Sequence, residues 1–124
     1  MTTTHTTVAA FDVDGTITVR DCVVPFMRQI PGARRIVSRL AARPDRLATA
    51  LARRDRDRLK TLAAAAAFRG LSEQEVTRTG IDFARHVHDH WLRRDTIERL
   101  RSHTECGQSV VLVSASFEVY LRPL

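Results

Sequence analysis

Residues 8–16, with the sequence VAAFDVDGT, decide the fold class of this 124-residue chain. The first four are an unbroken apolar run and the rest form a polar turn, which is typical of a strand buried on both faces at the centre of a parallel sheet. A second apolar run, VVLV at residues 110–113, also ends in small polar residues, SAS at 114–116. We therefore predict an α/β fold with polar residues at the carboxyl ends of both strands, where open α/β sheets bind ligands.

Apolar residues at helical spacing predict helices between these two strands. We expect helices over 33–42, from Asp45, over 57–68, from the capping-box spacing at Ser72, and from Asp95 to residue 107. One more helix is expected after Ser116. Pro25 and Pro31-Gly32 are expected to break up the segment that follows the first strand.

Length and composition predict one compact globular domain, because 44% of the residues are hydrophobic and 27% are charged. No apolar run approaches the roughly 20 residues that cross a bilayer, so no integral membrane segment is expected. The opening MTTTHTT does not resemble a signal peptide, which favours a cytoplasmic location. Cys22 and Cys106 form no disulfide framework, and we expect both to be packing residues.

The positive charge belongs to one segment. Residues 28–60 hold ten arginines and one lysine against three aspartates, a net charge of +8, whereas the whole chain carries +6. Such a segment could be a solvated helix face, attract an anionic substrate, or bind a membrane surface or nucleic acid. Membrane binding is disfavoured, because alanine occupies positions where a membrane-surface helix needs large apolar residues. Nucleic-acid binding is disfavoured, because no aromatic residue lies between residues 27 and 67. We expect no nucleic-acid partner.

His86 and His90 are spaced four residues apart and would share one face of a helix. That spacing could bind a metal ion. The alternative is a solvated helix face with Val87 and Trp91 packed inward.

Asp12 and Asp14 place two carboxylates directly after the first strand. The first can attack a phosphorus atom, and the second, displaced by a turn at Gly15, can protonate the leaving oxygen and then activate water. Two carboxylates would repel an anionic substrate, which calls for a hard divalent cation, most plausibly Mg²⁺. The alternative is a capping turn in which Asp14 and Thr16 satisfy backbone N–H groups.

The segments FDVDGTIT (11–18) and VVLVSAS (110–116) resemble the first and second motifs of the haloacid dehalogenase (HAD) superfamily. The chain is most similar to subfamily IB, the phosphoserine-phosphatase-like branch. This resemblance implies a Rossmann-like core, residues 1–19 and 93–124, with a helical C1-type cap, residues 20–92, inserted after the first strand. It also implies a Mg²⁺-dependent phosphomonoester hydrolase that acts on a small phosphorylated metabolite.

The resemblance implies a role for each matching residue. Asp12 would form an aspartyl-phosphate and bind Mg²⁺ through its other carboxylate oxygen. Asp14 would be the general acid and base and would offer its backbone carbonyl to the metal. Ser114 would bind the phosphoryl group, together with backbone N–H groups near Gly15 and Ala115.

The cap would select the substrate. Asp21 falls where phosphoserine phosphatases carry an acidic residue for the substrate amine, and Lys60 or Arg69 could hold a substrate carboxylate. The alanine run at 63–67 occupies the stretch in which that branch has its carboxylate-binding arginine, so phosphoserine itself is not the expected substrate.

The superfamily also uses a third-motif Lys or Arg and a fourth-motif acidic pair, which would lie beyond residue 124. We therefore expect a C-terminally incomplete core, a fragment with absent or impaired activity, and self-association through the incomplete sheet. Two alternatives are a non-catalytic remnant that binds phosphate or a partner, and the N-terminal part of a fusion with a lipid acyltransferase.

Overall fold

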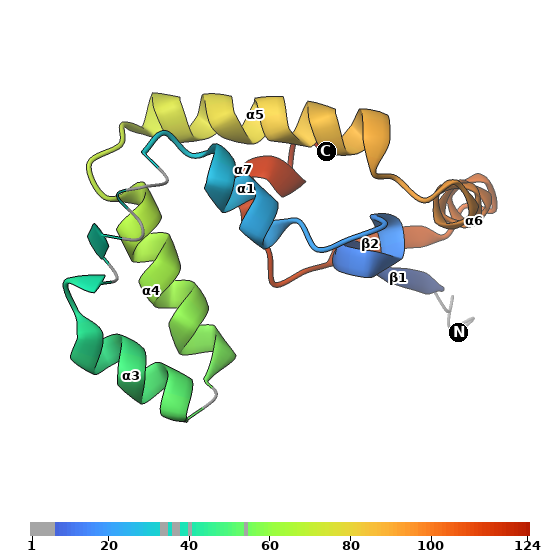
Figure 1. Ribbon diagram of the computed structural model, residues 1–124. Coiled ribbons are helices and arrows are strands. Elements are labelled where there is room, and N and C mark those ends of the chain that lie inside the picture. Colours follow the sequence, from blue (N-terminus) through green and yellow to red (C-terminus); the bar gives the residue numbers. More distant parts are fainter. Residues whose placement is uncertain (1–6, 33–34, 36–37, 40, 54) are drawn as a thin grey trace, which may run out of the picture.

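The computed structural model describes residues 7–32, 35, 38–39, 41–53 and 55–124, without the side chains of 47, 50, 56 and 60 (Figure 1). Its elements are β1 (Val8–Asp12), η1 (Val13–Ile17), α1 (Val23–Gln29), α3 (Pro44–Ala52), α4 (Arg56–Phe68), α5 (Glu73–His90), α6 (Arg94–Glu105), β2 (Ser109–Val113) and α7 (Glu118–Leu121). The helix expected over 33–42 falls largely outside the described residues. The mixture of helices around a small parallel sheet agrees with the predicted α/β class.

The two strands lie side by side and run parallel. Their register pairs Val8 with Ser109 and Asp12 with Val113, so both strands end at the same edge of the sheet. Parallel neighbours need a long crossover connection, which the helices α1 to α6 provide. The predicted strand bounds at 8–11 and 109–113 are confirmed to within one residue.

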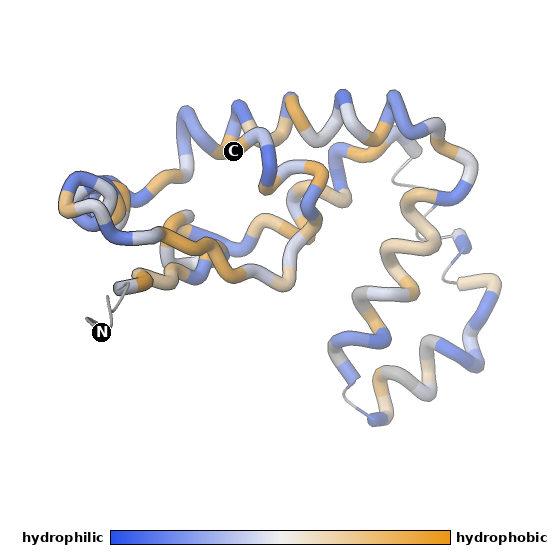
Figure 2. Tube along the Cα trace, turned by 180° about the vertical axis from the view of Figure 1, so that it is seen from behind, coloured by the Kyte–Doolittle hydropathy of each residue, from blue (hydrophilic) through white to orange (hydrophobic). Residues whose placement is uncertain are grey.

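The expectation that both strands are buried on both faces is wrong for the structure described. Val111, Leu112 and Val113 remain 45%, 49% and 56% exposed, and Val8 is 56% exposed. Among the described residues the sheet holds two strands, and α6, which contacts β2, does not bury those side chains. Figure 2 shows the strands as hydrophobic stretches beside the hydrophilic α6. Self-association through this sheet stays a prediction.

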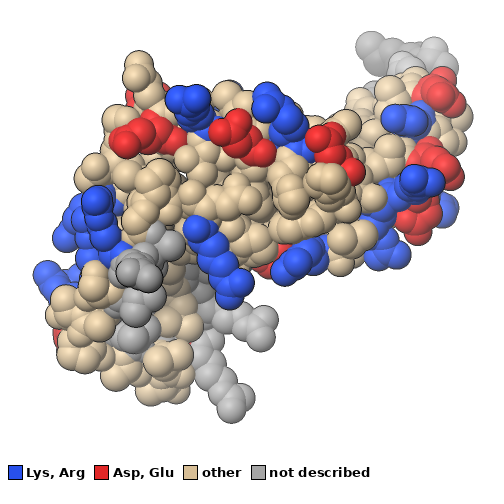
Figure 3. Space-filling model, turned by 45° about the horizontal axis from the view of Figure 1, so that its top comes forward, with Lys and Arg blue, Asp and Glu red and all other residues tan. Residues whose placement is uncertain are grey.

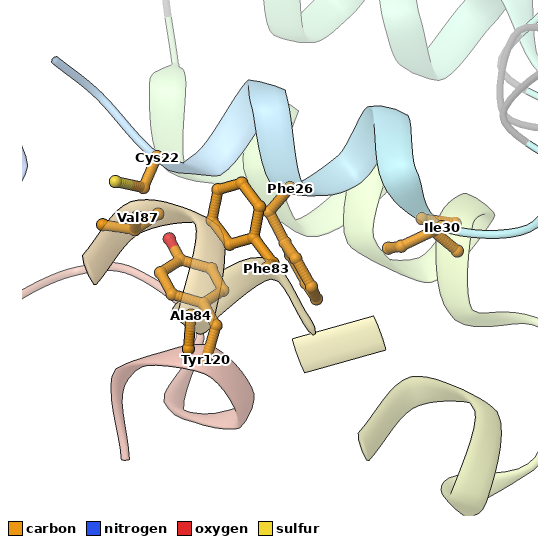
Figure 4. Packing of buried hydrophobic residues seen from close by; sticks show 8 residues of the cluster. Cys22, Phe26, Ile30, Phe83, Ala84, Val87 and Tyr120 are labelled. Atoms are coloured by element: carbon orange, nitrogen blue, oxygen red, sulfur yellow. The ribbon is translucent and has the colours of Figure 1, made fainter. Parts of the chain in front are cut away.

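The main hydrophobic core lies among the helices (Figure 4). Phe26 of α1, Phe83 of α5 and Tyr120 of α7 are fully buried, and their ring centroids lie 4.8–5.3 Å apart. Such tilted and edge-to-face pairs add to the free energy gained by burial alone. Val87 is also buried and Trp91 is half-buried, as predicted for the inner face of this helix.

Helix α5 approaches α7 closely at Gly80. A Cβ atom at this position would lie 2.5 Å from the backbone oxygen of Val119, so a residue with a side chain would push the two helices apart. This contact brings α7, which follows the second strand, against the long helix that precedes α6.

Local signals set several helix ends. Ser72 caps α5 and forms the predicted capping box with Glu75, and α3 starts at Pro44, one residue before the predicted start, because proline is favoured in the first turn. Two expectations are wrong. Helix α1 forms despite Pro25, which lies in its first turn, where no intrahelical N–H bond is lost. Helix α6 is preceded by Arg93 as its N-cap, and Asp95 lies within its first turn.

Helices α3 and α4 form a pair that projects from the rest of the molecule, at the opposite end from the sheet (Figure 1). The long segment that contains this pair begins and ends at one place. Thr18 and Leu92 form an antiparallel bridge, flanked by hydrogen bonds of 2.8 Å from Val19 N to Trp91 O and from Arg93 N to Ile17 O.

Candidate active site

The carboxyl ends of β1 and β2 bring the predicted site residues to one edge of the sheet. Asp12 is paired with Val113, so Ser114 directly follows the residue beside Asp12. The Asp12 side chain is exposed, and its carboxylate makes no hydrogen bond or ion pair within the part of the chain that the structure describes. It is therefore open to a ligand that approaches along the strand ends.

The turn after Asp12 has the dihedral angles of a type II β-turn. Asp14 has φ −70° and ψ 113°, and Gly15 has φ 79° and ψ −2°. The second central position of this turn requires positive φ, which glycine adopts without strain. The turn sends Asp14 to a different position from Asp12, as the pair of roles predicted from the sequence requires.

The buried Thr18 hydroxyl supports this turn from behind. Its Oγ1 accepts the Gly15 N–H at 3.3 Å and lies 3.1 Å from the Val13 carbonyl oxygen and 2.7 Å from that of Arg20. The guanidinium of Arg93 contacts the same turn, with Nη1 at 3.4 Å from the Gly15 carbonyl oxygen. Neither residue was predicted as part of the site, because neither role follows from local sequence.

The Asp14 carboxylate is held by hydrogen bonds on both oxygens. Oδ1 accepts the backbone N–H of Cys22 at 2.8 Å. Oδ2 accepts the hydroxyls of Ser114, at 3.5 Å, and of Ser116. The Ser116 N–H donates in turn to Ser114 Oγ at 3.0 Å. Ser114 and Ser116, which follow β2, therefore orient Asp14. Only Ser114 was predicted from the sequence, although the Ser-Ala-Ser pattern at 114–116 also indicates Ser116.

Behind Asp14 the site is closed off by buried side chains. Burial raises the pKa of the Cys22 thiol to about 11, a rise that the hydrogen bond from the thiol to Thr18 reduces and the nearby Asp14 carboxylate increases. Burial also raises the pKa of the Tyr120 phenol well above its usual value, and its hydroxyl finds no hydrogen-bond partner among the described residues. Cys22 is thus a neutral packing residue, as expected, whereas Cys106 is exposed, contrary to expectation, because it lies at the solvent-facing end of α6.

The three predicted cap residues do not gather at the strand ends. The Asp21 carboxylate accepts the backbone N–H of Val23 at 2.9 Å and so holds the first turn of α1. Arg69 follows α4 and lines a separate cavity among other arginines. The side chain of Lys60 lies outside the described residues.

A cavity of about 440 Å³ separates α4 from the end of β2. Ala115 and Phe117 line it on one side, and Val23 of α1 lines it as well. The α4 side contributes Thr61, Ala64, Ala65 and Phe68. Ala64 and Ala65 of the alanine run thus face the strand ends, and none of the described side chains that line this space is charged.

Within the described ranges, no three His, Cys, Asp or Glu side chains gather into a group that could hold a metal ion. His86 and His90 share a face of α5, as their spacing predicts, with ring centroids 4.8 Å apart. Both are exposed. No helix in the described part of the chain has the length and apolar content needed to cross a membrane.

A family model of haloacid dehalogenase-like hydrolases matches residues 9–124. The match takes in both strand ends and everything between them, so the chain belongs to the family of haloacid dehalogenase-like hydrolases. No curated protein and no solved structure matches the chain. The superfamily predicted from FDVDGTIT and VVLVSAS is therefore confirmed.

Proposed function

We propose that this chain is the phosphatase type of haloacid dehalogenase-like hydrolase, which hydrolyses phosphate monoesters through an aspartyl-phosphate. The carrying observation is the convergence of Asp12, Asp14 and Ser114 at the adjoining ends of two parallel strands. An exposed carboxylate without a partner among the described residues and a second carboxylate held by hydrogen bonds suit two different roles.

Asp12 is the proposed nucleophile. Its carboxylate oxygen attacks the phosphorus atom, the phosphorus–oxygen bond to the alcohol breaks, and the phosphoryl group is carried on Asp12 until water releases it as inorganic phosphate. Ser114 and the backbone N–H groups near Gly15 and Ala115 are proposed to donate to the phosphoryl oxygens.

Asp14 is the proposed general acid and base. In the first step it protonates the leaving alcohol oxygen, and in the second it removes a proton from the attacking water. The hydrogen bonds from Cys22 N and Ser116 support this assignment, because they hold the carboxylate in one orientation while the Ser114 hydroxyl turns to the phosphoryl group.

The donor set fits Mg²⁺, which binds hard oxygen ligands and keeps several of its water molecules. The Asp12 carboxylate is exposed and lacks a protein partner among the described residues, and it would hold the metal together with the Asp14 backbone carbonyl. When bound, Mg²⁺ would reduce the repulsion between the two carboxylates and an anionic phosphate.

Residues 20–92 are proposed to form the substrate-selecting cap of subfamily IB. The bridge between Thr18 and Leu92 supports these limits, because the segment leaves and rejoins the remainder at one point. The apolar cavity beside Ala115 suits a small metabolite with an uncharged part next to its phosphate. Phosphoserine is disfavoured, because no arginine among the described side chains lines that cavity to hold a carboxylate.

The test is single-turnover release of p-nitrophenol from p-nitrophenyl phosphate, with and without Mg²⁺, together with the intact mass of acid-quenched protein. We expect Mg²⁺-dependent release at an impaired rate, with a transient phosphoryl adduct, in the wild-type chain. Asp12→Asn should abolish both, because an amide is a poor nucleophile.

Asp82→Asn is the matched control, because it removes an exposed carboxylate from α5, and it should behave as wild type. Retained turnover in Asp12→Asn would refute the nucleophile. Neither release nor adduct from a folded wild-type chain would refute the enzyme and favour a phosphate-binding module.

A further inference from the structure

Four arginines surround one small cavity on the projecting helical pair. The cavity has a volume of about 120 Å³ and is lined by Arg39, Arg43, Arg46 and Arg69, with Leu62, Ala65 and Ala66 of α4. The four arginines come from three segments that are separate in the sequence: residues 38–39, the start of α3, and the end of α4. On the face shown in Figure 3, basic side chains predominate at the left, over this helical pair, whereas acidic and basic side chains alternate along α5.

No carboxylate pairs with these arginines, although Asp45 lies in the first turn of α3, between Arg43 and Arg46 in the sequence. All 14 Asp and Glu residues of the chain are among the described residues, and none of them lines the cavity or lies within ion-pairing distance of the four arginines. Four guanidinium groups around a cavity of this size repel one another unless an anion lies between them.

Arg39 is already oriented by the protein. Its Nη1 donates to the carbonyl oxygens of Ala66, at 2.8 Å, and Arg69, at 2.7 Å, which are acceptors at the end of α4. Of the five N–H groups of a guanidinium, three are left without an acceptor among the residues placed by the structure. The half-buried Arg39 therefore joins two segments and keeps donors for a ligand.

Helix α3 adds to the positive potential. Arg43 is its N-cap residue, and no side chain caps its first turn in the described structure. Arg46 lies in that first turn, where the helix dipole favours an anion. Two of the four arginines thus extend from the positive end of a helix.

We propose that this arginine pocket, formed by Arg39, Arg43, Arg46 and Arg69, binds a phosphate-type oxyanion. Guanidinium groups bind phosphate oxygens in pairs of hydrogen bonds, and the volume accommodates a phosphate group but not a whole nucleotide. The pocket is separate from the proposed catalytic site, because the cavity beside Ala115 is lined by a different face of α4, with only Ala65 in common. The inference does not depend on the proposed hydrolysis.

Calorimetric titration of the full chain with inorganic phosphate tests this proposal, at low ionic strength and without divalent metal. Chloride at equal ionic strength is the reference. We expect one phosphate per chain, and the double variant Arg43→Gln/Arg46→Gln should weaken binding by about tenfold or more, since two charge-assisted donors are lost. Arg99→Gln/Arg101→Gln on the exposed face of α6 makes the same charge change elsewhere and should change the affinity less than about twofold.

Two further measurements distinguish the arginine pocket from the proposed catalytic site, and a phosphorylated metabolite from free phosphate. In the wild-type chain, phosphate should shift the backbone amide resonances of Ala66 and Arg69 rather than those of Gly15 and Ala115. Glycerol phosphate in place of phosphate distinguishes a metabolite, which would bind more tightly, from the free ion. Binding no stronger than that of chloride, resonance shifts at Gly15 and Ala115 in place of those at Ala66 and Arg69, or equal losses in both arginine pairs would overturn the proposal.

Discussion

The strand ends and the aromatic cluster of α1, α5 and α7 are held together by different kinds of interaction. At the strand ends the apolar side chains of β2 stay about half exposed, and polar groups such as Asp14 form the ordered contacts. In the cluster, Phe26, Phe83 and Tyr120 are fully buried and contact one another. Hydrophobicity along the chain therefore does not locate the core. The most apolar runs are the strands, yet the helices bury the largest side chains.

The two regions nevertheless adjoin. Cys22 belongs to the buried cluster, and its backbone N–H holds Asp14. Tyr120 of the same cluster lies four residues after Ser116, whose hydroxyl also binds Asp14. Substitutions can therefore test whether catalysis and folding stability change independently.

The largest effect is expected from Asp14→Asn. The amide oxygen can still accept the Cys22 N–H, so stability should change by less than about 1.5 kcal/mol, whereas loss of the acid and base should slow turnover by about 10²–10⁴-fold. Parallel rates on an alkyl phosphate and on p-nitrophenyl phosphate check this, because the alkyl ester needs the acid more. An equal loss on both substrates would contradict the role of Asp14 as the acid.

Phe26→Ala should have the largest effect on stability. It removes the ring at the centre of the cluster and leaves a cavity among Phe68, Phe83, Phe117 and Tyr120. We expect a loss of about 3–5 kcal/mol in the free energy of unfolding, measured by urea denaturation. Val111→Ala, at a half-exposed strand position, is the matched control and should cost less than about 1 kcal/mol. Similar losses at the two positions would remove the distinction between the regions.

The smallest effect concerns alkaline pH. Burial raises the pKa of Cys22 from 9.0 to about 11 and also raises that of Tyr120. Both groups are neutral when folded over a range in which the unfolded chain ionises them. The contribution of Cys22 is complete below about pH 9 and is lost as the pH rises through about 11, and that of Tyr120 is lost at higher pH.

Tyr120→Phe removes one of these acids and a buried hydroxyl that lacks a partner in the described structure. We expect it to be neutral or slightly stabilising at pH 7 and to lose less stability than wild type above pH 9. Thermal unfolding between pH 7 and 11 measures both effects. An unchanged pH profile would show that Tyr120 does not titrate with unfolding.

Several features follow from the sequence alone, because they depend on neighbouring residues. The apolar runs determine the two strands, Ser72 and Glu75 determine the start of α5, and Gly15 is the one residue in its turn that adopts positive φ without strain. The DxD spacing and the family motifs also place Asp12, Asp14 and Ser114 at strand ends, since the carboxyl ends of parallel strands share an edge.

Only the tertiary structure decided which distant residues meet. Ser116 reaches Asp14 across 102 positions of sequence, and the arginine pocket draws Arg39 and Arg69 together through a contact between α4 and a preceding segment. The spacing of apolar residues shows which face of a segment is apolar but not what packs against that face. It therefore did not predict the exposure of β2 or the burial of α1 against α5. Burial and ion binding are set by long-range packing, because they depend on which surfaces are brought together rather than on the conformation of any one segment.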